Sequence, residues 1–86
     1  MITIELYGVP RLRAGKEAFT VEAASLGEAL AALVEACPAL DPSVIHDGAL
    51  LPYYLIARNG TQFTADPKTP LSPGDTLILL SAEAGG

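Results

Sequence analysis

Apolar and polar residues alternate along two segments near the start of the chain. In residues 2–8 the apolar side chains of Ile2, Ile4 and Leu6 fall on one face, with polar or amphipathic residues between them. Residues 17–23 alternate in the same way, with Phe19 and Val21 on one side. This period of two is typical of half-buried strands. Residues 9–16 contain the loop-forming residues Pro10 and Gly15, so we expect a hairpin with a long loop.

Residues 25–37 show the longer period of a helix. Their apolar stripe recurs at helical spacing and comprises Leu26, Leu30, Leu33, Val34 and Cys37. Ser25 and Glu28 have the spacing of a capping box, in which the carboxylate returns to the N–H of the cap residue. Pro38 ends the pattern because its ring clashes with a preceding helical turn. Cys37 is interpreted as a small buried apolar residue.

The second half of the chain predicts short strands separated by loops. Residues 38–52 are irregular, with one helical turn expected at 42–46 and a turn at Asp47-Gly48. Residues 53–65 predict two short strands around Asn59-Gly60, a strong hairpin signal. A connector rich in proline (66–75) leads to a final strand at 75–81.

The final strand is apolar on both faces. Leu77 and Leu79 lie on one side, and Ile78 and Leu80 on the other. Such strands tend to be central and parallel to a neighbour. We therefore predict an α+β fold of the β-grasp type: a mixed sheet of about five strands on one main helix, with the first and last strands central and parallel. The helix covers one face, which leaves Ile78 and Leu80 beside Tyr7 on an uncovered apolar face of the kind that binds partners.

Length and composition limit the classes of function. The chain of 86 residues has a net charge of -5 and five basic residues, which argues against nucleic-acid binding. That acidity favours a basic protein partner and equally serves solubility. No apolar run approaches the roughly 20 residues of a membrane span, and no signal peptide is recognised. The single cysteine fits a reducing cytoplasm, and we expect a free monomer.

Catalytic and metal-binding patterns are missing from the sequence. His46 and Cys37 are predicted in different elements, and His46 beside Asp47 is interpreted as a solvated pair. No metal-ligand spacing or phosphate-binding glycine motif occurs, and the acidic residues are interpreted as scattered solvated charges. The sequence therefore predicts a protein that is not itself an enzyme, binds no metal and holds no cofactor.

Several stretches resemble the ubiquitin-like sulfur carriers of the MoaD/ThiS family. The end of the chain, "GDTLILLSAEAGG", has the Gly-Asp turn, apolar strand and final Gly-Gly of that family, preceded by "PLSPGD". "IARNG" and "MITIELYG" resemble two other strands, so the likeness covers nearly the whole chain. The longer loop at 38–52 is similar to carriers that serve cysteine synthesis.

The resemblance implies a division into a β-grasp domain at 1–80 and a flexible tail at 81–86. An E1-like adenylyltransferase and sulfurtransferase would use ATP to adenylate the carboxylate of Gly86. A sulfur donor would then convert it to a thiocarboxylate, which a sulfur-accepting synthase subunit would use. The resemblance leaves the pathway open between molybdopterin, thiamine, cysteine, tRNA thiolation and a siderophore. The family pattern implies tail residues Glu83, Ala84, Gly85 and Gly86, and docking residues Tyr7, Phe63, Ile78 and Leu80.

The chain departs from the family pattern in two places. Ser81, Ala82 and Glu83 stand where a proline-containing aliphatic segment is frequent, and Glu83 is interpreted either as a partner of a basic residue or as solvated. Arg58 replaces a usual aliphatic residue, and it is expected to extend from the sheet edge or to mark a different docking surface. Two other functions stay open: a ubiquitin-like modifier joined through Gly86 to lysines, and a β-grasp binding module with an inert tail.

Overall fold

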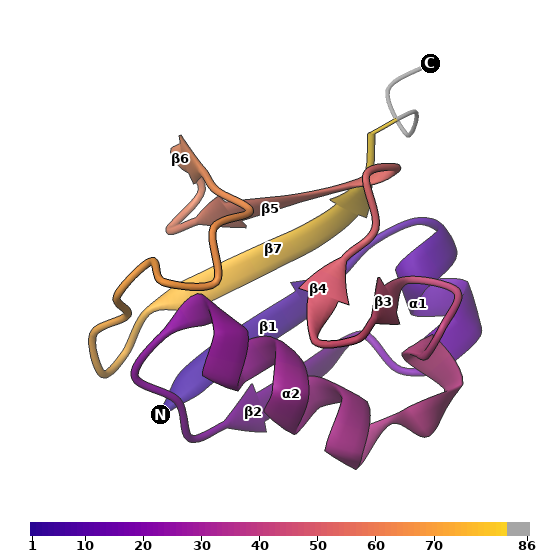
Figure 1. Ribbon diagram of the computed structural model, residues 1–86, viewed down its shortest axis with the longest axis horizontal. Coiled ribbons are helices and arrows are strands. Elements are labelled where there is room, and N and C mark those ends of the chain that lie inside the picture. The colour runs from indigo at the N-terminus through magenta and orange to yellow at the C-terminus, as the bar shows by residue number, and fades with distance from the viewer. Residues whose placement is uncertain (83–86) are drawn as a thin grey trace.

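A five-stranded mixed sheet with one main helix across it forms the centre of the computed structural model, which describes residues 1–82 (Figure 1). The helix is α2 (Leu26–Ala36). The strands of the sheet are β1 (Ile2–Leu6), β2 (Ala18–Val21), β5 (Tyr54–Arg58), β6 (Gln62–Phe63) and β7 (Thr76–Ser81). This arrangement confirms the predicted β-grasp plan.

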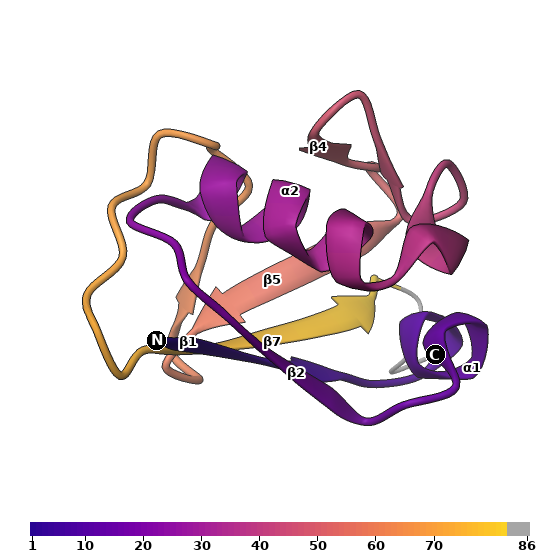
Figure 2. The same cartoon turned by 90° about the horizontal axis from the view of Figure 1, so that it is seen from below.

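The strand order is β2-β1-β7-β5-β6. β1 and β7 run parallel and the other neighbours antiparallel, which confirms the predicted pairing of the first and last strands. Ile2, Ile4 and Leu6 of β1 are buried. Leu77 and Leu79 of β7 are buried as well. These side chains share one face because partners in register point the same way. α2 lies across that face (Figure 2).

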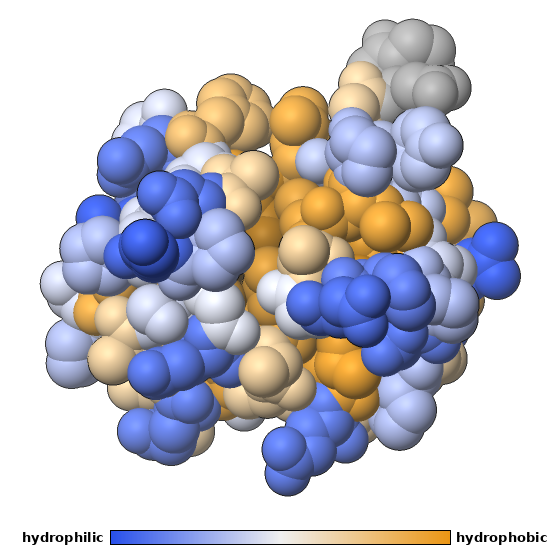
Figure 3. All heavy atoms as spheres, viewed as in Figure 1, coloured by the Kyte–Doolittle hydropathy of each residue, from blue (hydrophilic) through white to orange (hydrophobic). Residues whose placement is uncertain are grey.

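Helix α2 packs on the sheet through the predicted stripe. Leu26, Leu30 and Leu33 are fully buried in the core, while Val34 is partly buried against it. Cys37, the residue at the helix end, is buried as predicted. On the side of the molecule that carries α2, hydrophobic residues lie between patches of hydrophilic residues (Figure 3).

The first turn of α2 is held by a capping arrangement that differs from the expected one. Ser25 Oγ accepts a hydrogen bond from the N–H of Glu28 at 3.3 Å, as predicted. The Glu28 carboxylate, however, accepts from the N–H of Ala24 at 2.8 Å, one residue before the cap. The connector supplies two further acceptors, since the N–H groups of Leu26 and Gly27 donate to the carbonyls of Thr69 and Pro67. The free N–H groups of the helix end are thereby satisfied.

Two local predictions were wrong. The expected loop at 9–16 contains a short helix, α1 (Val9–Ala14), which begins with Pro10 in its first turn and ends at Gly15 in the left-handed conformation. Proline is compatible with a first helical turn and glycine with a helix end, so these loop signals belong to a helix. The helical turn expected at 42–46 lies earlier, as a 3-10 helix (Pro38–Leu40).

A small hairpin follows that turn and was not predicted as strands. β3 (Ile45–His46) pairs with β4 (Ala49–Leu50) in a separate two-stranded sheet. Asp47 and Gly48 form the predicted turn between them, both with positive φ (52° and 76°). Each strand has two residues, too short to show an alternating pattern. No helix within residues 1–82 is long and apolar enough to cross a membrane.

Asp75 corrects the prediction that all acidic residues are solvated charges. It is buried just before β7, with 8% of its surface exposed. Its carboxylate accepts from the Ser72 N–H at 2.8 Å, from the Asn59 amide at 3.0 Å and from Arg58 Nε at 2.8 Å. The Ser72 N–H, then Asn59 and Arg58, lower the pKa of Asp75 to about 2. The Gly-Asp turn signal in the sequence does not indicate this hydrogen-bond network.

The same network explains Arg58. Its guanidinium forms an ion pair with Asp75, and its side chain is 24% exposed. Arg58 therefore does not extend freely from the sheet edge, which was one of the two expectations for it. It joins the end of β5 to the turn that precedes β7.

The Asp75 network predicts a stability difference that depends on pH. Because the folded pKa lies below the ordinary value near 3.9, the charged carboxylate stabilises the fold above about pH 4. This contribution is lost as pH falls towards 2. Asp75→Asn should therefore lower the free energy of unfolding at pH 7 and differ much less from wild type at pH 2. Urea unfolding at both pH values measures this difference.

Glu35→Gln is the matched control, because Glu35 is exposed on α2. Its free energy of unfolding should follow that of the wild type at both pH values. An Asp75→Asn protein as stable as wild type at pH 7 would contradict the stabilising role of the carboxylate.

Candidate functional site

The sheet face opposite α2 carries a group of partly exposed apolar side chains. Leu55 pairs with Leu80, and Ala57 pairs with both Ile78 and Phe63, so these residues share one face. Phe63 is 64% exposed, and Ile78 and Leu80 are partly buried. No helix within residues 1–82 covers this face (Figure 2). We call it the outer face: Leu55, Phe63, Ile78 and Leu80, with the buried Ala57 between them and Tyr7 at its border.

The two faces of β7 are as the sequence predicted. Leu77 and Leu79 are fully buried on the other side, while Ile78 and Leu80 are not. Leu55 was not among the candidate residues, although it is 38% exposed and directly opposite Leu80. The sequence of β5 does not single it out, because Leu55, Ile56 and Ala57 are consecutive apolar residues.

Tyr7 is held in place at the border of the outer face. Its N–H donates to the carbonyl of Leu79 at 3.0 Å, which extends the pairing of β1 with β7. Its hydroxyl donates to Glu5 Oε1 at 3.0 Å, and the Arg11 guanidinium lies 4.8 Å from its ring centre. The hydrogen bond to Glu5 and the charge of Glu5 raise the pKa of Tyr7. The phenol therefore stays neutral and half exposed next to Leu80.

Arg11 fixes this corner of the molecule from α1. Its Nε donates to the carbonyl of Leu6 at 2.8 Å, so the guanidinium spans from the end of β1 to the ring of Tyr7. On the exposed side of the same helix, Leu12 is 81% exposed. The sequence prediction of a loop left these α1 residues out of the candidate set.

The end of β7 directs the chain from the sheet next to the outer face. Ser81 pairs with Tyr54, so the sheet extends one residue beyond the predicted domain boundary at residue 80. The N–H of Ala82 then donates to the carbonyl of Tyr53 at 2.7 Å. The predicted tail residues Glu83, Ala84, Gly85 and Gly86 lie outside the described residues. The structure therefore places the base of the predicted tail beside Leu80.

Catalytic and metal-binding groups do not converge within residues 1–82. No group of three or more His, Cys, Asp and Glu residues there could hold a metal ion. His46 is exposed, with its ring nitrogens 3.6 Å from Asp41 and 3.5 Å from Asp47. Cys37 is buried in the core cluster. The outer face is the candidate for binding a partner because its apolar side chains are exposed.

Three solved structures resemble the whole chain. SAMP1 from Haloferax volcanii is 32% identical, with a TM-score of 0.83, and the match covers 99% of this chain and 98% of that one. A chain in the complex of subunits 1 and 2 of molybdopterin-converting factor from Helicobacter pylori 26695 is 26% identical, with a TM-score of 0.66, and the match covers 99% and 97%. A chain in the Amycolatopsis orientalis BexX/CysO complex has the same fold at 18% identity, with a TM-score of 0.82 and full coverage of both chains. No protein-family model and no curated protein matches the sequence.

The two faces of β7 predict different costs for the same substitution. Leu79→Ala should lower the free energy of unfolding by about 2–5 kcal/mol, because it leaves a cavity in a closed core. Leu80→Ala should cost less than about 1.5 kcal/mol, because Leu80 is only partly buried. Urea unfolding of both variants at pH 7 makes the comparison. Equal losses would mean that the outer face is packed as tightly as the core.

Proposed function

The chain belongs to the MoaD/ThiS-like family of ubiquitin-like sulfur carriers, and we propose that it carries sulfur as a thiocarboxylate on Gly86. The observation that carries this proposal is the match to SAMP1 at 32% identity over nearly the full length of both chains. The sequence given ends in Gly85-Gly86 after a strand that the sheet holds through Ser81. A folded domain followed by residues 83–86, here called the arm, suits a carrier that presents its last residue to other enzymes.

The proposed chemistry begins at the carboxylate of Gly86. A carboxylate is a poor electrophile, because attack would have to expel oxide. An E1-like partner would let it attack the α-phosphorus of ATP, which releases pyrophosphate and forms an acyl-adenylate. Hydrosulfide would then attack the carbonyl carbon and expel AMP, leaving a thiocarboxylate. A persulfide donor would instead form an acyl disulfide, from which a thiol would release the thiocarboxylate by reducing the S–S bond. In this scheme the chain is a co-substrate, and the catalytic groups belong to its partners.

The small residues of the arm fit such a reaction. Glycine lacks a Cβ, so Gly85 and Gly86 accept backbone conformations that other residues resist. A side chain at Gly86 would lie next to the reacting carbonyl. Ala84 and Glu83 connect the glycines to Ala82, and Glu83 is the one charged side chain in the last four residues. Its carboxylate is suited to a basic residue in the partner's channel.

The outer face is the proposed docking surface for these partners. Phe63 and Leu55 supply exposed apolar area, and Tyr7 adds an aromatic ring with a polar tip. The chain leaves β7 beside Leu80, so a partner bound to this face receives the arm at its border. The structures of the BexX/CysO complex and of the molybdopterin-converting factor complex support the view that such chains work in contact with another protein.

A second candidate function is that of a protein modifier. Another structure 32% identical to the chain is described as small archaeal modifier protein 1 from H. volcanii. The same adenylated Gly86 would then react with the amino group of a target lysine to form an isopeptide bond. Both functions share the activation step and differ in the nucleophile, which can be sulfur or amine.

Deletion of Gly86 separates activation from folding. The shortened chain should keep the unfolding free energy of the wild type, because no core residue is removed. It should gain no thiocarboxylate when incubated with the activating enzyme, ATP and a sulfur donor. Intact mass spectrometry detects the product as a mass increase equal to the difference between sulfur and oxygen. Glu35→Gln, on the helix side of the molecule, is a control that should be loaded normally.

Mass spectrometry of protein from the native cell distinguishes the candidates. A thiocarboxylate supports the carrier, and a Gly-Gly remnant on lysines of other proteins supports the modifier. An unmodified wild-type end under full activation conditions would overturn both.

Substitutions on the outer face test the docking surface. Phe63→Ser combined with Leu55→Ser should raise the KM for thiocarboxylate formation about tenfold, which corresponds to ~1.4 kcal/mol of binding. The kcat should change little, because the arm and its carboxylate are unchanged. Urea unfolding provides the control for stability. A KM equal to that of wild type would remove this face from the docking surface.

A further inference from the structure

β2 is an edge strand whose outer side has no partner among residues 1–82. The register shows which residues of β2 bond to β1. The Leu6 N–H donates to the carbonyl of Glu17, and in an antiparallel pair every second residue repeats this bonding. Phe19 and Val21 therefore direct their backbone groups towards β1. The backbone groups of Ala18, Thr20 and Glu22 point to the open edge. Such an edge is a template for an added strand.

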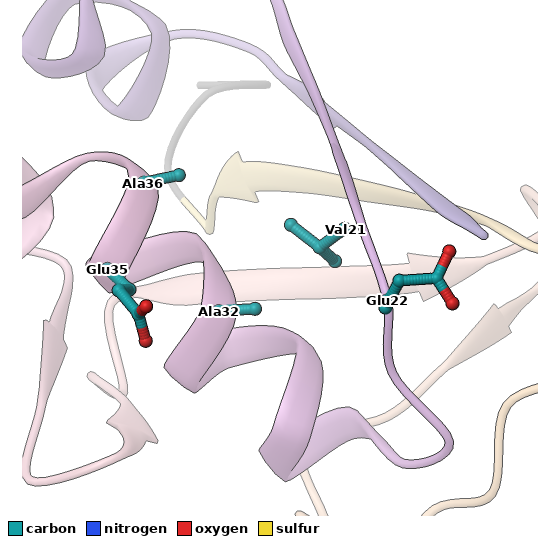
Figure 4. Close-up of a pocket in the computed structure, with 5 residues that line it drawn as sticks. All are labelled: Val21, Glu22, Ala32, Glu35 and Ala36. Carbon is teal, nitrogen blue, oxygen red and sulfur yellow. The ribbon is translucent and has the colours of Figure 1, made fainter.

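A groove lies between the end of this strand and α2. Val21 and Glu22 line it from β2, and Ala32, Glu35 and Ala36 line it from the helix, around a volume of about 360 Å³. Figure 4 shows the methyl groups of Ala32 and Ala36 directed from α2 towards the side of Val21. The small alanine side chains leave room between helix and strand. The groove therefore combines an apolar floor with an open strand edge.

The charges around the groove are of one sign. Glu22 and Glu35 are on its two sides, and no lysine or arginine lines it. The nearest basic residue in sequence, Lys16, lies over the ring of Phe19, with its Nζ 4.8 Å from the ring centre. No ion pair joins Glu22 or Glu35 to a basic residue within 1–82. Both carboxylates are thus available to a cationic ligand.

We propose that this edge and groove bind an extended, basic peptide segment of a partner protein as an added strand beside β2. Backbone groups of the peptide pair with Thr20 and its edge neighbours. Alternate side chains of an added strand point to the side of the sheet that α2 covers, so a small aliphatic side chain enters the groove above Ala32 and Ala36. The lysine or arginine side chains between them point to the opposite side of the sheet and pair with Glu22, while the charge of Glu35 adds a longer-range attraction.

The opposite edge of the sheet is a poorer template. β6 has only two residues, whereas β2 has four and contains no proline. Acidic residues at an edge also discourage pairing between copies of the same chain. They do so by repelling the acidic edge of a second copy, and the same charges attract a basic strand. A neutral or acidic peptide is therefore the comparison. It distinguishes an edge that selects basic peptides from an edge whose charges only prevent pairing between copies.

The proposed site lies apart from the proposed docking surface. The groove is formed with α2, and the outer face is on the other side of the sheet. A bound peptide would thus leave Phe63, Leu80 and the base of the arm accessible. The inference does not depend on the chemistry at Gly86, and a partner held here could bind while the arm is engaged elsewhere.

The test is an NMR titration of the isotopically labelled chain with a synthetic peptide of core sequence Val-Lys-Val-Arg-Val. We expect saturable binding with a Kd below about 1 mM, with shifts at the amides of Ala18, Thr20 and Glu22 and the methyl groups of Ala32 and Ala36. A peptide with both basic residues replaced by glutamate should not bind. Glu22→Lys combined with Glu35→Lys should weaken binding at least ~10-fold.

A pair of variants at Thr20 tests the added strand. Thr20→Pro removes an N–H that faces the open edge, where proline is tolerated, and should abolish binding. Thr20→Val keeps the N–H and should bind as wild type does. A dispersed amide spectrum for each variant shows that it is folded. Absence of binding by the basic peptide, shifts centred on β6 or the outer face, or undiminished binding by folded Thr20→Pro would each overturn the proposal.

Discussion

The parallel pairing of β1 with β7 is the contact on which the rest of the structure depends. It joins the first and last strands of the chain, so almost the whole sequence lies between two adjacent strands. β1 then supports β2, and β7 supports β5, which in turn holds β6. Helix α2 can bury its leucines only against the face that these two central strands complete. A pairing so distant in sequence costs loop-closure entropy, which the leucine and isoleucine core must outweigh.

That central position gives β7 two distinct environments. One side of it is closed by α2, and the other faces outward with apolar residues that no described element covers. A surface strand of a typical domain would carry polar residues there. The fold thus holds an apolar surface rigidly next to the point where the chain leaves the sheet. A binding surface on a central strand keeps its geometry because both neighbours hold it in register.

The sequence predicted those features that have a strong period or a strong local signal. The alternation of Ile2, Ile4 and Leu6, the helical stripe and the apolar final strand together predicted the sheet, its helix and the outward placement of Ile78 and Leu80. The prediction was wrong where two signals compete, as in α1, where Pro10 and Gly15 are compatible with both a loop and a helix boundary. It also missed Leu55 and the role of Asp75. Both depend on neighbours that are distant in sequence, namely Leu80 and the pair Asn59 and Arg58.

Asn59 illustrates how narrowly a turn residue can be constrained. Its backbone is left-handed, with φ of 52°, and its side chain donates to Asp75 and accepts from the N–H of Thr76 at 2.9 Å. Glycine would suit the backbone but has no side chain to make either bond. Aspartate tolerates the backbone but would set a second carboxylate against Asp75. Among sequences that keep this fold and this network, position 59 therefore has almost no freedom to vary, although the residue lies on the surface.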